Sequence, residues 1–420
     1  MLTKIEHKVN RPRIVSAITE LGKAAISGGN FLVLAAILGP YTYGNYVVLA
    51  AIAAILVPFA SVGYASWVQP LAGKSGKEAA AAAALPVIVL VGLPIVAAAS
   101  VAMMFLGFSS PKALFLVLLA EMTLYPTWST MTYSLLAKGK AWSYVAFSLF
   151  APATKFMATL ITYFLGSKDI ATWATTVNIS GACGFIVTII IFNALSFKTG
   201  LRSFKHWYKR GLGFAAVGIA SALTDNIDRL IVGKTLGSFS VGVYGMAGKL
   251  GGYGAVPVRS IAIVAYPQFF ELVENRNYNG VKRLMYSIIR RGVIVGIAAW
   301  LCVVFACYIA SNTLLHSYAG VFICTIILAA CIPLRAAQYG AGDVLYALDN
   351  SRLRLLITFA GALISAAGAW VGSIHFGLFG GASGLLIAQV IVAGVLIWGA
   401  ELSINKSRAR HENSILKEVG

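Results

Sequence analysis

Charged residues are scarce in this chain. Only 11% of its 420 residues are Asp, Glu, Lys or Arg, whereas 59% are hydrophobic. A soluble domain carries about 25% charged residues, so this composition excludes an ordinary globular protein and predicts a polytopic membrane protein. The first thirteen residues are polar and basic, and the apolar run that follows is too long for the core of a signal peptide. We therefore expect the first segment to remain as a membrane helix.

Cysteine and histidine are also few, with five residues of each type. The cysteines lie in apolar segments without CxxC spacing or a nearby histidine, which is typical of small buried side chains and not of metal sites or disulfides. The histidines fall at predicted helix ends or in loops. Neither a zinc site nor a catalytic triad is predicted, so we expect no metal, no cofactor and no enzymatic activity. The cysteines are Cys183, Cys302, Cys307, Cys324 and Cys331.

Apolar segments long enough to cross about 30 Å of hydrocarbon recur along the whole chain. They predict an all-α integral membrane protein of about twelve transmembrane helices. The predicted spans are 14–38, 43–69, 80–107, 111–137, 142–165, 171–195, 212–234, 241–270, 284–311, 318–347, 353–374 and 378–402. Turn-like sequences separate several of them, at Gly39-Pro40, at Pro70 to Lys77 and at Gly166 to Asp169. The longest predicted loop, Ser196 to Gly211, contains FKHWYKR, which favours an anchor on anionic lipid headgroups and leaves a partner-binding site open.

Acidic residues number 14 against 33 basic ones, which gives a formal net charge of +19. In a soluble protein this excess would suggest a nucleic-acid partner. Here the basic residues gather in alternate connections, whereas the other side has little beyond Lys112 and Lys168. By the positive-inside rule both termini are predicted to be cytoplasmic, and no nucleic-acid partner is expected. The basic connections contain Lys4, Lys8, Arg11, Arg13, Lys74, Lys77, Lys138, Lys140, Lys198, Arg202, Lys205, Lys209, Arg210, Arg276, Lys282, Arg283, Arg290, Arg291, Arg352, Arg354, Lys406, Arg408, Arg410 and Lys417.

Two short motifs occur twice in the chain. The pattern LG-x4-G-x-Y starts at Leu38 and again at Leu236, an offset of 198, and a GAxG pattern starts at Gly181 and again at Gly381, an offset of 200. Two repeats at nearly one offset, close to half the chain, predict a duplication. We expect a six-helix half over 1–200, a second over 201–405, and a polar cytoplasmic tail over 406–420. The halves would be parallel repeats about an axis along the membrane normal, a design in which the substrate lies between the halves.

Charges inside the predicted spans are the candidates for function, because charges in a membrane are costly and usually face a protein interior or a cavity. In the first span Glu20, Lys23, Ser27 and Asn30 step by three, four and three and share one helix face. In the seventh span Asp225, Asp228 and Arg229 are similarly related. Both stripes could face a central cavity, or Glu20–Lys23 and Asp225–Arg229 could be salt bridges that only hold helices together. The complete set is Glu20, Lys23, Glu121, Lys155, Asp225, Asp228, Arg229, Lys234, Lys249, Arg259, Arg335 and Asp343.

Cations exceed anions in this set by seven to five, which favours a cavity that accepts an anion such as a diphosphate. Lys155, Lys249, Arg259 and Arg335 have no opposite charge within one helical turn, although a partner on another helix stays open. Lys234 lies near a span end, where a lysine snorkels to the interface. The predicted substrate-binding residues are Lys23, Lys155, Arg229, Lys249, Arg259 and Arg335. The candidates for ion coupling or for salt bridges are Glu20, Asp225, Asp228 and Asp343.

Three stretches resemble a known family. LGPYTYGNY after the first span, IDRLIVGKTLGSFSVGVYGMAGKL across the seventh and eighth, and LDNSRLRLL before the eleventh are similar to the polysaccharide exporters. These are the O-antigen and exopolysaccharide flippases of the multidrug/oligosaccharidyl-lipid/polysaccharide (MOP) superfamily, and the likeness covers essentially the whole chain. The resemblance implies two six-helix halves around a cationic cavity, and an ion gradient as a candidate driver. It implies transport of undecaprenyl-diphosphate-linked oligosaccharide across the bacterial cytoplasmic membrane for surface polysaccharide synthesis.

The expected partners are therefore the lipid-linked oligosaccharide and anionic membrane lipids, with the polymerase and chain-length proteins of the same pathway as further candidates. The main alternative is a cation-coupled multidrug exporter of the same superfamily, for which an acidic or apolar cavity would be expected. A membrane glycosyltransferase or polymerase would need a sizeable polar loop or an acidic catalytic cluster, and neither is visible in the sequence. A membrane scaffold without transport would not explain cations in mid-span.

Overall fold

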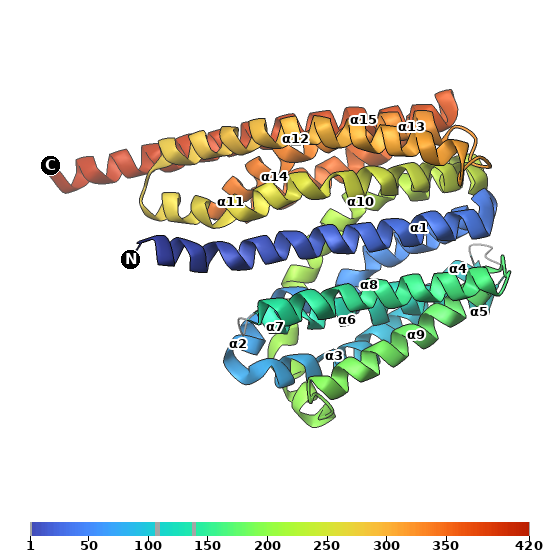
Figure 1. The fold of residues 1–420 in the computed structure, drawn as a ribbon. Helices are drawn as coiled ribbons and strands as arrows, with labels where there is room; N and C mark the ends of the chain where they lie inside the picture. The colour runs from blue at the N-terminus through green and yellow to red at the C-terminus, as the bar shows by residue number, and fades with distance from the viewer. Residues whose placement is uncertain (1, 106–109, 137–139, 420) are drawn as a thin grey trace. The chain divides into compact units, whose positions relative to one another are not determined.

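The structure, a computed structural model, describes residues 2–105, 110–136 and 140–419. Throughout these ranges every regular element is a helix, so the predicted all-α class is confirmed (Figure 1). Nine of the described helices are long and apolar enough to cross a membrane. Three of them contain a glycine with non-helical backbone angles and are each two helices joined at a kink. Lys138, and the side chains of Lys4, Lys8, Arg11, Arg13, Arg210 and Lys417, lie outside the described part.

The chain divides into two compact units, Met1–Gly233 and Lys234–Gly420. Unit 1 contains short helices and π-helical segments as well as long helices, and the long α10 begins in it. Its elements are α1 (Leu2–Ala60), α2 (Tyr64–Ala82), α3 (Ala84–Val87), η1 (Ile88–Gly92), α4 (Leu93–Phe105), α5 (Pro111–Leu119), η2 (Ala120–Leu124), α6 (Tyr125–Met131), α7 (Tyr133–Leu136), α8 (Ala141–Phe164), α9 (Ile170–Ile191) and the first part of α10 (Phe197–Gly254). The expected transport halves, divided at residue 200, stay a prediction.

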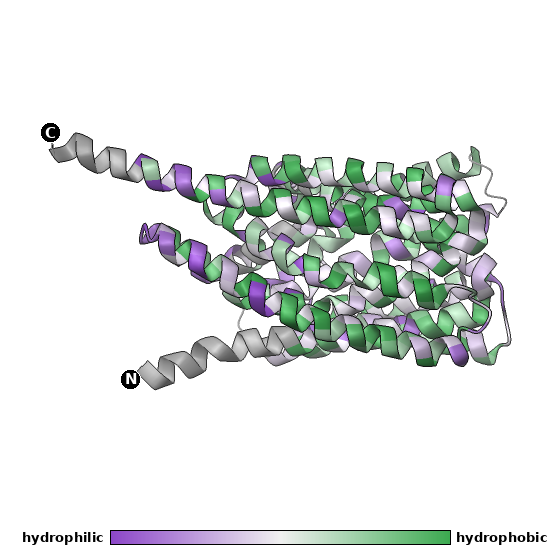
Figure 2. Ribbon diagram, turned by 90° about the horizontal axis from the view of Figure 1, so that it is seen from above, coloured by the Kyte–Doolittle hydropathy of each residue, from purple (hydrophilic) through white to green (hydrophobic). Residues whose placement is uncertain are grey.

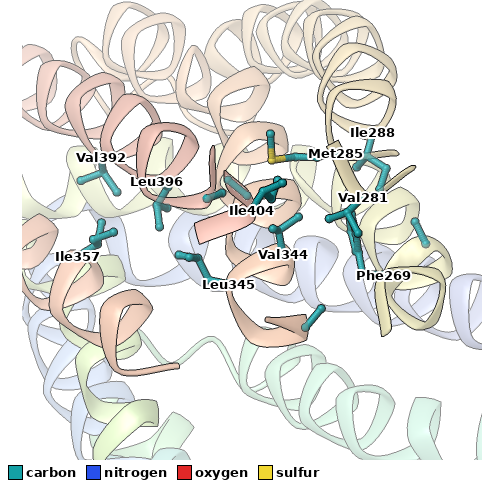
Figure 3. Packing of buried hydrophobic residues seen from close by; sticks show 14 residues of the cluster. Phe269, Val281, Met285, Ile288, Val344, Leu345, Ile357, Val392, Leu396 and Ile404 are labelled. Carbon is teal, nitrogen blue, oxygen red and sulfur yellow. The ribbon is translucent and has the colours of Figure 1, made fainter. Parts of the chain in front are cut away.

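Unit 2 holds the remainder of α10 and five further helices. These are α11 (Val256–Glu274), α12 (Tyr278–Asn312), α13 (Val321–Ala329), α14 (Cys331–Ala347) and α15 (Ser351–Val419). Its core is a cluster of aliphatic and aromatic side chains from α11, α12, α14 and α15, including Phe269, Met285, Val344 and Leu396 (Figure 3). Hydrophobic residues fill the middle of the long helices, whereas hydrophilic ones gather at ends such as the α11–α12 connection (Figure 2).

The repeated LG-x4-G-x-Y motif has the same local structure in each unit. Gly39 has φ 69° and Gly237 has φ 80°, in the left-handed region that residues other than glycine adopt only with strain. Each glycine ends one helix and allows the next to start at once in a new direction, without an intervening loop. The motif tyrosines that follow, Tyr46 and Tyr244, are both buried, with 1% and 0% of their surface exposed. The motif is therefore a kink followed by an anchoring side chain.

The second repeat, GAxG, provides space for close packing. In α9 a Cβ added to Gly184 would lie 2.3 Å from the ring of Trp128, and one added to Gly181 would lie 2.9 Å from Tyr125. In α15 a Cβ on Gly384 would lie 2.0 Å from the backbone oxygen of Gly368. Small residues let membrane helices approach each other closely, so both copies keep a helix surface clear.

Both π-helical segments of unit 1 precede a proline. The segment η1 ends at Gly92, two residues before Pro94, and η2 ends at Leu124, two residues before Pro126. Proline lacks the amide that would bond the carbonyl four residues earlier, and its ring crowds that carbonyl. A wider π-turn accommodates the lost bond, and such turns are frequent at functional sites.

Three sequence predictions about connections were wrong. The predicted loop 196–211 is helical, because the hydroxyl of Ser196 accepts the Thr199 amide and caps the start of α10. The predicted span 43–69 ends as a helix at Ala60, and a separate α2 follows. The predicted turn from Pro70 to Lys77 lies within α2, where only Gly76 departs from helical angles, with φ 91°. The polar stretch after residue 405 continues α15 as helix to Val419.

Candidate functional site

A pocket of about 190 Å³ lies inside unit 1 between α1, α6 and α8. Its lining is rich in polar side chains, although the surrounding helices are apolar. The residues that line it are Lys23, Ser27, Asn30, Phe31, Tyr125, Ser129, Ala151, Pro152 and Lys155. The stripe predicted from spacing on the first span is therefore present, because three of its four members face one pocket.

Lys23 is held from two sides at this pocket. Its ammonium lies 2.8 Å from the carboxylate of Glu20, one turn earlier on α1. The same ammonium lies 5.6 Å from the ring centre of Tyr144 and 5.7 Å from that of Tyr133. An aromatic face attracts a cation, so the two rings stabilise a charge that is only 17% exposed. The local salt bridge that spacing left open is thus formed.

Lys155 has its partner on another helix. Its ammonium lies 2.5 Å from the carboxylate of Glu121 in η2, and Tyr46 donates a hydrogen bond of 2.8 Å to the same carboxylate oxygen. The rings of Tyr125 and Trp173 lie 5.4 Å and 5.8 Å from the ammonium. The side chains of Lys155 and Glu121 are 13% and 18% exposed, so the pair is largely shielded from solvent.

A chain of hydrogen bonds fixes Asn30 at the other side of the pocket. Trp173 donates its indole N–H to the hydroxyl of Thr159 at 2.9 Å, and Thr159 donates to the amide oxygen of Asn30 at 2.6 Å. Asn30 is 3% exposed. Its oxygen accepts from Thr159, so the orientation of the Asn30 amide beside the pocket is fixed by this chain of hydrogen bonds.

The charged residues of the stripe predicted on the seventh span differ in their exposure to solvent. Asp225 is exposed, whereas Asp228 is 4% exposed. Arg229 is half-buried and donates to the amide oxygen of Asn226 at 2.7 Å. These residues belong to the part of α10 in unit 1, and none of them lines the pocket described above.

The remaining predicted residues belong to unit 2. Lys249 and Arg335 are half-buried, and Arg259 is exposed. Asp343 lies 3.5 Å from the guanidinium of Arg354, which also donates to the carbonyl of Gly342 at 2.9 Å and stacks 4.0 Å from the ring centre of Tyr346. Arg354 belongs to the LDNSRLRLL stretch, so that sequence supplies the partner of Asp343.

Glu121, Tyr46, Tyr125 and Trp173 were not among the predicted site residues. Glu121 was counted as a charge within a span but given no role, because its partner is 34 residues away in sequence. A signal for Tyr46 was present, since it is the last residue of the repeated motif. For Tyr125 and Trp173 the sequence holds no comparable signal, because aromatic residues are common throughout membrane helices.

No family model matches the chain, and no curated protein matches it significantly. Solved structures do match over nearly the whole length. An inward-facing multidrug resistance MATE family transporter of the MOP superfamily has a TM-score of 0.68 at 14% identity, with 94% of this chain and 96% of that chain covered. The chain has the fold of these transporters.

Two further structures carry the same MATE-like fold. An outward-facing MATE family transporter of the MOP superfamily has a TM-score of 0.64 at 13% identity, covering 95% of this chain and 96% of that one. A MOP superfamily transporter from Pyrococcus furiosus, described as having a binding pocket of reverse polarity that suggests a different function, has a TM-score of 0.60 at 14% identity, covering 94% and 96%. Identities this low establish the fold, and they do not separate polysaccharide flippases from drug exporters.

Proposed function

We propose that the chain is a flippase that moves undecaprenyl-diphosphate-linked oligosaccharide across the bacterial cytoplasmic membrane for surface polysaccharide synthesis. The observation that carries the proposal is the pocket of unit 1. Lys23 and Lys155 both line it together with Ser27, Asn30 and Ser129, and no acidic residue is among its described lining residues. Cations with neutral donors suit a diphosphate or a sugar hydroxyl.

The physical reason for such a protein is the cost of moving the headgroup. A diphosphate cannot enter hydrocarbon without losing its hydration, whereas a polyprenyl tail can remain in lipid throughout. A polar path lined by fixed cations would replace the water that hydrates the diphosphate as the headgroup crosses the membrane.

Pockets for drug-sized ligands occupy about 300–1,000 Å³. At about 190 Å³ the pocket has room for a small anionic or sugar group, and the rest of the headgroup would lie outside it.

A cation-coupled multidrug exporter is the second candidate. It is favoured by the solved multidrug MATE transporters that share the fold, and by the carboxylate of Glu121 beside the pocket. In that case Glu121 would hold the coupling ion or a cationic drug, and the lysine would be its exchangeable partner. In the flippase the lysines would recognise an anionic substrate, whereas in the exporter Glu121 would recognise a cation. One experiment therefore separates the two functions.

The experiment replaces the chain in its bacterium with Lys155→Met, with Glu121→Gln, and with the control Lys112→Met. Lys112 is an exposed lysine at the start of α5 and does not line the pocket. The flippase function predicts that Lys155→Met lowers surface polymer and accumulates lipid-linked oligosaccharide, both measured per amount of protein in the membrane because loss of the ion pair with Glu121 also destabilises the chain. Normal polymer in a deletion strain, together with increased sensitivity to cationic drugs, would establish the exporter instead.

A further inference from the structure

An open groove of about 640 Å³ runs between α11 and α12 in unit 2. Most of its lining is aliphatic, with Ile261, Val264 and Ala265 from α11 and residues such as Ile288 and Ile294 from α12. Ile288 also belongs to the core cluster, so the floor of the groove is fixed by packing behind it (Figure 3). One cation, Arg291, is part of the lining.

A second groove of about 650 Å³ adjoins the first along α12 and has the opposite character. It is lined by Asn279, Lys282, Arg283, Tyr286, Ser287 and Arg290, and Ser287 is shared with the apolar groove. Lys282 and Tyr286 both contact the carboxylate of Glu401, at 3.0 Å and 2.7 Å. Only the remaining cations of this surface are therefore available to a ligand.

The remaining cations are Arg283 and Arg290 of this second groove and Arg291 of the apolar groove, and all three side chains are exposed. Within the described part of the chain they form no hydrogen bond or ion pair with protein. An arginine has five N–H donors and keeps its charge at any physiological pH. The three guanidinium groups and the aliphatic groove beside them therefore present a positive charge and an apolar surface that a single ligand could contact together.

We propose that α11 and α12 bind one anionic phospholipid, with an acyl chain in the apolar groove and the phosphate held by Arg290 and Arg291. The groove's α12 residues run from Leu284 to Val295, about 16 Å at 1.5 Å per residue. Arg291 lies within this length, about 6 Å from the Val295 end at 1.5 Å per residue, so the first part of an acyl chain beyond the phosphate would contact Ile294 and Val295. The basic residues lie toward the end of α12 that the positive-inside rule predicts to be cytoplasmic.

A membrane lipid is favoured over a protein partner by the surroundings. The neighbouring side chains of α11 and α12 form an exposed apolar surface, with Ile263 45%, Ile294 62% and Ile297 43% exposed, as in a helix face that meets hydrocarbon. An anionic headgroup is favoured over a zwitterionic one because, among the described residues, no carboxylate pairs with Arg283, Arg290 or Arg291. Basic surfaces at the cytoplasmic end of membrane helices select anionic lipids in this way. The proposal does not depend on which substrate the transporter moves.

Native mass spectrometry of the purified full-length chain tests the site with phosphatidylglycerol and phosphatidylcholine. We expect the wild type to retain phosphatidylglycerol preferentially, and Arg290→Gln and Arg291→Gln each to weaken its binding about fivefold, the factor that corresponds to about 1 kcal/mol per basic residue. Arg352→Gln is the matched control, because Arg352 is another exposed arginine of unit 2 and lines neither groove. An equal loss in Arg352→Gln would mean diffuse attraction and would overturn the site.

The apolar half is tested separately by filling the groove. Val264 lines it, whereas the adjacent Ile263, which is similarly exposed, does not. Val264→Trp should reduce the retained lipid and Ile263→Trp should not, at equal yield and equal thermal stability. If the wild type retained phosphatidylcholine as well as phosphatidylglycerol, the arginines would not select the lipid headgroup. Displacement of phosphatidylglycerol by equimolar polyprenyl diphosphate would reassign the groove to a lipid-linked substrate. Either outcome contradicts the proposal.

Discussion

The ammonium of Lys155 on α8 lies 2.5 Å from the carboxylate of Glu121, which projects from the π-helical segment η2. Tyr46, the last residue of the repeated motif after the Gly39 kink, donates to the same oxygen. Three separate elements of unit 1 therefore meet at one ion pair. The pair sits at the edge of a pocket that contains Lys155 itself, so any change in the protonation or occupancy of Glu121 alters the charge that the pocket presents.

Removing either member of this pair should destabilise unit 1. Breaking a largely buried ion pair leaves a charge without compensation and costs about 3 kcal/mol. We expect Glu121→Gln and Lys155→Met each to lower the thermal unfolding temperature in detergent. The double variant Glu121→Gln/Lys155→Met should be less destabilised than the sum of the two, because no lone charge is left. Strict additivity of the two losses would show that the residues do not interact.

The hydroxyl of Tyr46 should contribute a measurable but smaller amount. Its hydrogen bond to a carboxylate is worth about 1.5–3 kcal/mol, and Tyr46→Phe removes the hydroxyl that donates it while the ring stays buried. The loss should fall to about 0.5–1.5 kcal/mol in a Glu121→Gln background, where the amide oxygen still accepts the bond but carries no charge. Tyr163→Phe serves as the control, since Tyr163 is 59% exposed. A Tyr46→Phe protein as stable as wild type would exclude the bond as a stabilising contact.

The fold was predictable from sequence because its signal is repeated and local. Apolar runs of membrane length recur along the chain, and the motif glycines at Gly39 and Gly237 mark equivalent kinks that the 198-residue offset already relates. The errors came from amphiphilic connections. At Ser196 to Gly211 polarity suggested a loop, but a cap at Ser196 and the helix propensity of the basic residues favour a continuous helix.

The candidate site was predictable only in part. Lys23, Ser27 and Asn30 share a face of one helix, and helical spacing alone shows this. The partner of Lys155 comes from a different helix, and no periodicity within one segment relates it to Glu121. The same holds for Asp343, whose partner Arg354 follows a turn between two helices. Pairings between elements depend on packing, which a single sequence does not encode in any simple spacing.

Alanine at either motif glycine should be costly for a backbone reason alone. Nothing lies within 4 Å of a Cβ placed on Gly39 or Gly237, yet both have positive φ. Their ψ angles, 167° and −178°, place them in a region that essentially only glycine adopts. We therefore expect Gly39→Ala and Gly237→Ala each to destabilise by about 1–3 kcal/mol through backbone strain. Gly394→Ala is the matched control, because its Cβ is equally unobstructed while its φ is ordinary; it should be neutral or stabilising by up to about 1 kcal/mol. Equal effects at all three positions would refute the strain explanation.

The proposed flippase function predicts that polymer export is lost when the cations are removed, even where the protein remains intact. Lys23→Met should lower polymer export by about tenfold or more, because one of the two lysines that line the pocket is gone and a charge-assisted contact contributes about 1.5 kcal/mol or more. Arg259→Ala and Arg335→Ala, predicted from sequence as substrate contacts, should also stop export without impairing membrane insertion. Each variant is compared at native expression by surface polymer and by the amount of protein in the membrane.

The variant Glu20→Gln tests whether Lys23 recognises the substrate or only forms a salt bridge with Glu20. If the anion is recognised by Lys23, then Glu20→Gln frees the lysine and leaves export near the wild-type level, whereas a purely structural pair predicts equal losses in both variants.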